Sequence, residues 1–405
     1  MTTTPTSTTA PPFDPVEPDR DGGPTVLLLG EPATGKSSAA KCIVGRLVAS
    51  SPRGPHQVGV VDPRGEYGAL ADALGLRRIV LRPGGPERLN PLHAGPGAGR
   101  VEVEARRHAV VAALCEMSLS RELSAAEQRV VAATVGVLPC WPHGQPVLTN
   151  VVALLSEPSA EMIEWATEEA DNDQLCEWAE PVEPAEMVQV AAQLAWALGA
   201  LLDRELRGCF DAVTTVPTDG PGAVVDLSAF RAEESTLRLA TLATLAWVET
   251  AEATWRVNVI DDAWVLLGDE QATRYLVDWL ERADAATNIV ITHRLSDLHR
   301  PRVAGPLPGR WPARPPGDDG PSLVVRAEVF AGAFTTRAVF RLSHPGDVAL
   351  VQSALHLSLE EAGLIPHLGL GQAVWKEGEG AAVVVQYRIG ADEWVFCGDS
   401  HAMTV

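Results

Sequence analysis

Lysine is nearly absent from this 405-residue sequence, which contains only Lys36, Lys41 and Lys376. Acidic residues outnumber Lys and Arg by 53 to 32, and the formal net charge is −21. A polyanion repels the phosphate backbone of nucleic acids, so direct DNA binding is disfavoured. Residues 157–186 concentrate this charge, with eleven carboxylates and no Lys, Arg or His. Such a run is either a solvated helical face or a docking surface for a basic partner.

The sequence also lacks paired cysteines, long apolar runs and a recognisable leader. Its six cysteines are scattered without a C-x-x-C pair, which argues against zinc sites and disulfides and fits a reducing cytoplasm. No apolar run reaches the ~20 residues that a membrane-spanning helix needs. Residues 1–24 are Thr/Pro-rich without a basic start or apolar middle, so we expect a disordered tail. We expect a cytoplasmic protein that only its partners would recruit to the inner membrane face.

The most specific pattern lies in residues 25–38, TVLLLGEPATGKSS. An apolar strand runs into GEPATGKS, which satisfies G-x-x-x-x-G-K-[ST], and a helix over about residues 36–49 follows. Backbone N–H groups of such a loop face a phosphate chain, and the helix N-terminus attracts the same anion. Lys36 would reach the outer phosphates and the Ser37 hydroxyl would bind Mg²⁺. The predicted nucleotide-binding residues are Gly30, Glu31, Pro32, Ala33, Thr34, Gly35, Lys36, Ser37 and Ser38.

A second apolar strand, residues 257–260, ends on the carboxylates Asp261 and Asp262. In P-loop enzymes the first such residue holds Mg²⁺ and the next acidic residue polarises the attacking water. We therefore assign the metal to Asp261 and water activation to Asp262. Hydrolytic P-loop enzymes usually carry Glu at the second position, and an Asp carboxylate would stop about 1.3–1.5 Å short of it. Such misplacement costs about a hundredfold in rate, so nucleotide binding is a firmer expectation than fast turnover.

The strand over residues 288–292 ends on Thr292-His293-Arg294. His293 either senses the γ-phosphate, by donating a hydrogen bond to it or to the attacking water, or is a structural residue. Arg294 serves the same site, a neighbouring subunit, or only Asp297.

The strand over residues 57–62 ends on Asp62 and continues as D-P-R-G-E-Y. Loops at the carboxyl ends of parallel strands line the ligand crevice, so Asp62 and Glu66 lie on the correct edge for a site. The alternative is structural: Asp62 stabilises a turn and Glu66 caps a helix.

Apolar spacings of three and four dominate residues 101–209 and predict several helices inserted between strands of the sheet. The Trp residues here are expected to be core or interface anchors; they are Trp141, Trp165, Trp178 and Trp196. A Pro/Gly-rich loop over residues 303–322 follows the sheet. The predicted division is a tail (1–24), a core in two parts (25–100 and 210–302) around the helical insertion (101–209), the loop (303–322) and a carboxyl-terminal part of the ATPase domain (323–405).

Five motifs occur in order: G-x-x-x-x-G-K-S, D-P-R-G-E-Y, L-N-P-L, I-D-D-A-W and I-T-H-R-L-S-D-L. This set resembles the HerA–FtsK superfamily of RecA-like motors, and most closely the ATPases of conjugative transfer and type IV secretion. The resemblance runs from about residue 24 to the end, as in a motor domain without the usual amino-terminal domain. It implies an α/β, RecA-like P-loop NTPase fold with a mostly parallel central sheet, helices on both faces and an inserted helical subdomain.

The resemblance also implies ATP and Mg²⁺ as cofactors. It assigns Lys36 and Ser37 to phosphate and Mg²⁺, Asp261 to the metal, Asp262 to water activation and His293 to the sensor role. Asp262 stands at a position where Glu is usual in such enzymes, and His293 stands at a position where Gln is common. Such motors commonly close a hexameric ring in which an arginine completes the neighbouring subunit's site. Arg337 and Arg341 lie in the matching region, although an ordinary surface pair is the favoured interpretation.

Three functions compete on the sequence. The leading one is an ATP-hydrolysing motor or assembly ATPase that acts on protein partners of a conjugative or secretion machine. The second is a DNA-translocating ATPase, which the acidity disfavours. The third is a nucleotide-gated interaction protein that hydrolyses ATP slowly, because of Asp262. A P-loop kinase is more remote, since no second lid-like Arg cluster is evident.

Overall fold

The computed structural model describes residues 23–50, 57–95, 98–138, 145–167, 181–217, 220–250, 256–283, 286–299 and 322–397. Most of the predicted tail, most of the predicted loop over residues 303–322 and the middle of the acidic run lie outside these residues, as do Trp141 and Trp178.

A nine-stranded sheet forms the centre of the described chain, in the order β3-β4-β2-β5-β6-β1-β7-β8-β9. Neighbours from β3 to β7 in this order are parallel, whereas β8 pairs antiparallel with β7 and with β9. The predicted, mostly parallel central sheet is therefore confirmed. The strands are β1 (Thr25–Leu29), β2 (Gln57–Asp62), β3 (Arg77–Val80), β4 (Gly222–Asp226), β5 (Arg256–Ile260), β6 (Ala286–Thr292), β7 (Thr336–Val339), β8 (Gln372–Glu377) and β9 (Val383–Gln386).

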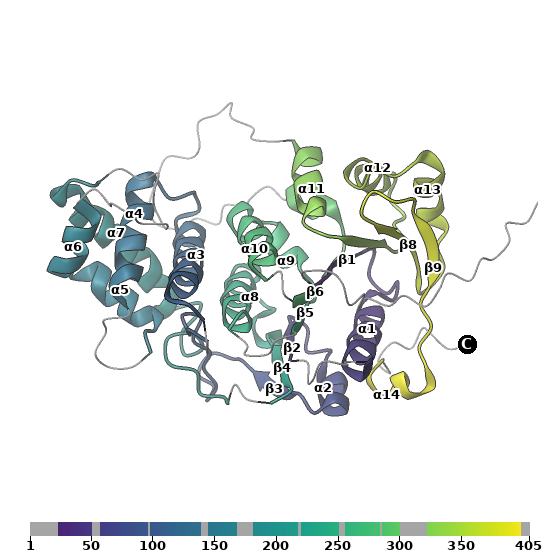
Figure 1. The fold of residues 1–405 in the computed structure, drawn as a ribbon, viewed down its shortest axis with the longest axis horizontal. Coiled ribbons are helices and arrows are strands. Elements are labelled where there is room, and N and C mark those ends of the chain that lie inside the picture. The colour runs from purple at the N-terminus through teal and green to yellow at the C-terminus, as the bar shows by residue number, and fades with distance from the viewer. Residues whose placement is uncertain are drawn as a thin grey trace, which may run out of the picture.

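Both faces of the sheet are covered, which explains why its central strands read as continuous apolar runs. In β1, Val26 and Leu28 belong to one buried cluster and Leu27 and Leu29 to another, as the period of two requires. The helices on the first face are α1 (Lys36–Ser50), α2 (Gly68–Leu74) and α14 (Trp394–Cys397), and those on the second are α8 (Glu234–Val248), α9 (Trp264–Leu267) and α10 (Glu270–Arg282) (Figure 1). Helices on both faces are thus confirmed.

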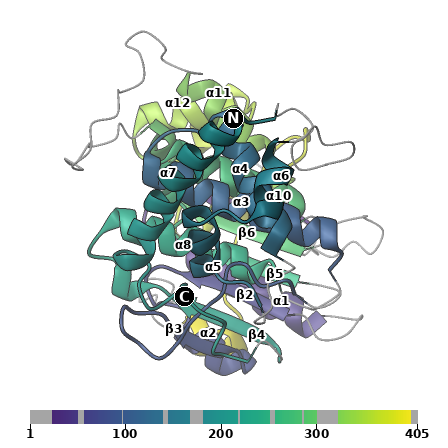
Figure 2. The same cartoon turned by 90° about the vertical axis from the view of Figure 1, so that its left-hand side faces the viewer.

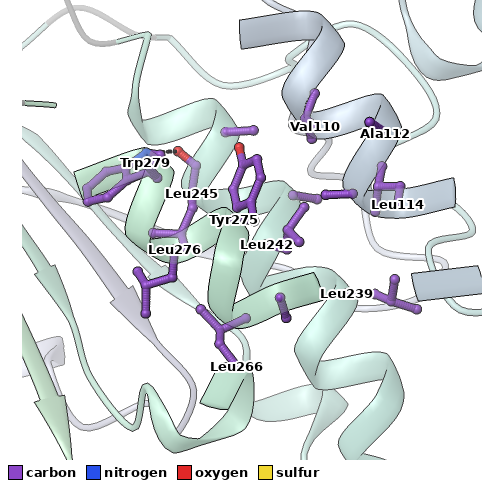
Figure 3. Close-up of a cluster of buried hydrophobic side chains, with 14 of the residues drawn as sticks. Val110, Ala112, Leu114, Leu239, Leu242, Leu245, Leu266, Tyr275, Leu276 and Trp279 are labelled. Atoms are coloured by element: carbon purple, nitrogen blue, oxygen red, sulfur yellow. Dashed lines mark hydrogen bonds between the residues drawn. The ribbon is translucent and has the colours of Figure 1, made fainter. Parts of the chain in front are cut away.

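Among the described residues, five helices lie between β3 and β4 and gather at one end of the molecule (Figures 1 and 2). They are α3 (Arg100–Leu119), α4 (Ala125–Val137), α5 (Leu148–Ser156), α6 (Ala160–Thr167) and α7 (Pro184–Asp203). Figure 3 shows that Val110 and Leu114 of α3 share a buried cluster with Leu242 of α8. In the same cluster the indole Nε1 of Trp279 donates to the carbonyl of Leu245 at 3.2 Å. Because the inserted helices share one core with the sheet's helices, the division into domains stays an interpretation.

Among the described helices, α7 is the one that is long and apolar enough, by length and composition, to cross a membrane. Met187, Leu194 and Leu198 on its inner face are fully buried. They belong to the same core as α3, α4 and α5, against which α7 packs. The inner face of α7 is therefore part of the protein core.

The carboxyl-terminal elements pack beside β7 and β8 (Figure 1). They are α11 (Leu323–Gly332), α12 (Pro345–Ala354), α13 (Leu359–Leu364) and the 3₁₀ turn η4 (Ile365–His367). The turn η5 (Ala391–Glu393) contacts α14, η2 (Ser228–Phe230) follows β4 and η3 (Leu295–His299) follows β6. The four described cysteines are free and buried. Two of them, Cys42 of α1 and Cys397 of α14, have their sulfur atoms 3.6 Å apart, a contact that the scattered spacing did not predict.

Candidate functional site

The carboxyl ends of β5, β6 and β1 lie side by side, because these strands are adjacent in the sheet. Leu29 is level with Thr292, and Ile260 is level with Val290. The Gly30 N–H donates to the carbonyl of Thr292 at 3.3 Å, and the Ala263 N–H donates to that of Ile291 at 2.8 Å. The segments that follow these strands therefore meet at one edge, where the sequence placed the nucleotide.

The loop from Gly30 to Lys36 curls around the carbonyl oxygen of Glu31. Lys36 Nζ donates to this oxygen at 2.8 Å, and Thr34 Oγ1 donates to it at 2.7 Å. Gly35 has φ +102°, a conformation that a side chain would strain, which explains the second glycine of the motif. Helix α1 begins at Lys36, so its N-terminus faces the loop, as the anion-binding prediction requires.

Two segments distant in sequence hold this loop in place. The Glu31 N–H donates to the carbonyl of Arg341 at 3.0 Å, and the Gly371 N–H donates to that of Thr34, also at 3.0 Å. The Glu31 carboxylate accepts from the Ser343 N–H at 2.8 Å and from the Ser343 hydroxyl at 2.9 Å. These hydrogen bonds lower the pKa of Glu31. The segments after β7 and before β8 thus set the shape of the loop.

Lys36 is 5% exposed, and burial lowers its pKa to about 8, while the charges of Asp261 and Asp262 oppose that shift. A poorly solvated ammonium attracts a phosphate strongly, since less water screens the pair. The fully buried Thr292 Oγ1 has no hydrogen-bond partner among the described residues. An unpartnered hydroxyl at the end of β6 is a polar group that a ligand would satisfy.

Asp62 has the structural role that the sequence left open. Its carboxylate accepts from the N–H groups of Arg64, Gly65, Glu66 and Tyr67, at 2.8 to 3.2 Å. It therefore fixes the D-P-R-G-E-Y loop. The capping role considered for Glu66 is wrong, because Tyr67 is the N-cap of α2 and no side chain caps that helix.

Asp261 is held from two sides. Its Oδ2 accepts from the Tyr67 hydroxyl at 2.9 Å, and its Oδ1 accepts from the Asp262 N–H at 2.7 Å. Each carboxylate oxygen keeps a second lone pair, so the group fits a hard cation such as Mg²⁺. In the described part of the chain no three His, Cys, Asp or Glu residues cluster into a metal site. Proteins usually hold Mg²⁺ through one or two carboxylates together with substrate phosphates, and Asp261 offers one such carboxylate.

Asp262 is 5% exposed and lies among three donor groups. Arg64 Nε lies 3.0 Å from its Oδ2, while His293 Nε2 and Trp264 Nε1 each lie 3.2 Å from its Oδ1. The His293 and Trp264 rings are stacked at 6.4 Å between centroids. Burial, and then the neighbouring Asp261, raise the pKa of Asp262 to about 6, against the opposing charge of Arg64. The structure thus brings the predicted base and the predicted sensor into contact.

The three arginines considered from the sequence have other partners. Arg294 Nε lies 3.8 Å from Asp347 Oδ2 of α12, a carboxylate that was not among the three alternatives considered from the sequence. Arg337 donates to the carbonyls of Ala331 and Gly378, at 3.0 and 3.1 Å. Arg341 is exposed, and its carbonyl accepts from the phosphate loop. An arginine finger stays a prediction without a structural test.

Sequence reasoning missed several residues of the site. Arg64, Tyr67 and Trp264 lie inside the motifs D-P-R-G-E-Y and I-D-D-A-W, so the motifs contained them but gave them no role. Ser343 and Gly371 follow and precede strands at the far side of β1, and no local pattern indicates their contacts with the loop.

Comparisons with known proteins bear on the fold of this chain. No protein-family model matches this chain, and no curated protein matches its sequence. VirB4 of Thermoanaerobacter pseudethanolicus matches its structure with a TM-score of 0.60 at 18% identity, over 91% of this chain and 90% of that one. The plasmid coupling protein TrwB with the ATP analogue ADPNP matches with a TM-score of 0.52 at 16% identity, over 90% and 85%. TrwB with ADP and Mg²⁺ matches with a TM-score of 0.51 at 15% identity, over 90% and 86%.

At these identities the similarity shows the fold. The chain has the α/β, RecA-like P-loop fold of VirB4 and TrwB, so the predicted fold is confirmed. The match with VirB4 covers 91% of this chain and 90% of that one, so it extends beyond the sheet into the inserted helices and the carboxyl-terminal elements.

Proposed function

We propose that this chain is a Mg²⁺-dependent motor or assembly ATPase of a conjugative-transfer or type IV secretion-like system, which hydrolyses ATP to act on protein partners of that machine. The observation that supports it is the meeting of Lys36, Asp261, Asp262 and His293 at the ends of adjacent strands. The fold shared with VirB4 and TrwB supports the biological setting. The proposal places the protein in the cytoplasm, with recruitment to the inner membrane face through partners.

In this proposal the phosphate loop and Lys36 bind the triphosphate. Ser37 and Asp261 would hold Mg²⁺, which neutralises charge on the phosphate oxygens when bound. Asp262 orients a water and accepts its proton while the water oxygen bonds to the γ-phosphorus and the bond to ADP breaks. His293 donates to the same water or to a γ-phosphate oxygen.

One observation favours a second candidate, a nucleotide-gated interaction protein with little hydrolysis. The Asp262 carboxylate already lies within 3.2 Å of groups on Arg64, Trp264 and His293. Two of these groups face Oδ1, so a water would have to bind the remaining lone pair of Oδ2 beside Arg64 or displace a partner. If Asp262 activates water slowly for this reason, the protein would bind ATP and change its contacts without fast turnover.

Steady-state phosphate release tests the proposal, with Lys36→Ala as the background. Release above this background supports the ATPase, and release equal to it, with ATP binding retained in the wild type, supports the nucleotide-gated protein instead.

Added single- or double-stranded DNA should stimulate release by less than roughly twofold at physiological salt, because few phosphate contacts are available. A specific activity that rises steeply with protein concentration would reveal sites shared in an oligomer such as a hexamer. A flat specific activity would indicate a self-sufficient monomer.

A further inference from the structure

The outer face of α7 is apolar and exposed. Val188 is 51% exposed and Trp196 is 66% exposed, and Ala185 and Ala192 are exposed as well. With the half-buried Gly199 they recur every three or four residues, so they form one line along the helix. At 3.6 residues per turn these five positions fall within an arc of about 80°. We refer to Ala185, Val188, Ala192, Trp196 and Gly199 as the α7 stripe.

Helix α7 is therefore apolar on its inner face and along the stripe, beside which Glu186 and Gln189 are also exposed. Its inner face is packed in the core, whereas the outer face of a surface helix is normally polar. Helix α5 widens the apolar surface, since a Cβ on Gly199 would lie 3.6 Å from Val152 Cγ1 of α5. An exposed Trp in such a surface is the type of residue that dominates binding energy in protein interfaces. The stripe thus has the composition of an interface.

Charge identifies the kind of partner. Residues 144–203 contain no Lys, Arg or His, so every charged side chain on α5, α6 and α7 is acidic, and the exposed Arg204 follows the last residue of α7. The described acidic residues here are Glu157, Glu161, Glu164, Glu183, Glu186 and Asp203, of which Glu183 and Asp203 flank the two ends of α7. A second copy of this chain, or an anionic lipid surface, would bring like charges together and is repelled. A partner with basic groups beside apolar ones is attracted.

We propose that the α7 stripe binds a basic amphipathic helix of a partner protein. The apolar face of that helix covers Trp196 and Val188, as in helix-in-groove recognition. Its Lys and Arg residues pair with the acidic residues of α6 and α7 named above. The stripe lies at the end of the molecule away from α1 and the phosphate loop (Figure 1). This inference goes beyond the proposed function, because it requires no hydrolysis and holds for either candidate function.

The test uses the full chain and a fluorescein-labelled Leu/Lys peptide of about 18 residues, five turns of an amphipathic helix. Fluorescence anisotropy measures its binding, in parallel with a peptide in which Glu replaces every Lys and with a scrambled Leu/Lys peptide. We expect the Leu/Lys helix to bind at least about tenfold more tightly than either comparison peptide. Trp196→Gln should weaken binding about tenfold and Val188→Gln several-fold. Leu359→Gln on α13 is the matched control, since Leu359 is 81% exposed and should leave binding unchanged.

Val188 and Trp196 are exposed, so their Gln variants should fold, and circular dichroism checks this. The phosphate release of both variants should equal that of the wild type. Equal binding of the scrambled peptide, or unchanged binding by Trp196→Gln, would overturn the proposal. A dimer in sedimentation that Trp196→Gln abolishes would assign the stripe to a second copy. Trp196-dependent binding to phosphatidylcholine vesicles would assign it to lipid. If deletion of residues 168–180 raised peptide affinity about tenfold, that segment would be the stripe's own cover.

Discussion

Arg64 Nε lies 3.0 Å from Asp262 Oδ2, and this ion pair joins the loop after β2 to the turn after β5. Asp262 is almost fully buried, while the Arg64 side chain is 44% exposed. The pair therefore joins a buried carboxylate to a partly exposed guanidinium, and Arg64 both compensates the charge of the proposed base and fixes its orientation.

The two residues should act as one unit in catalysis. Asp262→Asn should lower the rate of phosphate release on the order of a hundredfold or more, because the water loses its base. Arg64→Gln alone should lower it about tenfold, by releasing the carboxylate from its position. In the double variant, Arg64→Gln should lower the rate of phosphate release no further than Asp262→Asn does alone. Compared with independent effects, this corresponds to a coupling energy of about 1.4 kcal/mol, the equivalent of the tenfold effect. If the two effects multiplied, Arg64 would act on the phosphates independently of Asp262. Arg46→Gln, in an exposed ion pair with Glu393, is the control.

The backbone gives a reason for Asp at position 262. Asp262 has φ +49°, in the left-handed region that Asp tolerates better than most residues. Asp262→Glu should therefore cost about 1 kcal/mol of unfolding free energy, because Glu tolerates this conformation less well. The longer side chain should nevertheless preserve or raise turnover, since it brings the carboxylate closer to the water. Urea unfolding and phosphate release measure the two effects, and a fall of release to the Lys36→Ala background would refute the role of Asp262 in orienting water.

Tyr67 should affect the affinity of the site for Mg²⁺ without contacting the nucleotide. Its hydroxyl donates to Asp261 Oδ2, and partners of this kind orient a metal ligand and set its affinity. Tyr67→Phe should raise the Mg²⁺ concentration for half-maximal activity by about 10- to 100-fold. ADP binding without Mg²⁺ should stay unchanged. Tyr275→Phe, a buried tyrosine of α10, is the matched control. An equal effect of both variants on Mg²⁺ dependence would show that general loosening of the fold is the cause.

Local pattern and tertiary contact explain what the sequence could and could not predict. The phosphate loop was predictable, because its glycines, lysine and flanking elements are contiguous. The Tyr67–Asp261 and Ser343–Glu31 bonds were not, since 194 and 312 residues separate the partners. Arg294 shows the same limit: Asp297 is near in sequence, but the packing of α12 against η3 brings Asp347 to it.

A buried carboxylate in the inserted helices should make stability depend on pH. Glu127 completes the capping box of α4, accepting from the Ser124 N–H at 2.8 Å and from Arg121 at 2.6 and 2.7 Å. Burial raises the pKa of Glu127, but the bonds from Arg121 and Ser124 outweigh it, so the folded pKa is lowered below 4.5. A lowered folded pKa gives stability that is present above the unfolded value and is lost as the pH falls through the folded one.

Glu127→Gln should therefore lower the unfolding free energy at pH 7 by roughly 1–3 kcal/mol, because a buried charged hydrogen bond is lost. The difference in unfolding free energy between variant and wild type should narrow as the pH falls below about 4.5, where the carboxylate of the unfolded wild type becomes protonated, and should vanish below the lower folded pKa. Urea unfolding of the wild type and of Glu127→Gln at several pH values measures this difference in unfolding free energy. Glu361→Gln, in the exposed capping box of α13, is the matched control and should show a smaller gap, because solvent screens that carboxylate. A Glu127→Gln gap that stayed constant with pH would mean that packing, and not the charge of Glu127, stabilises the start of α4.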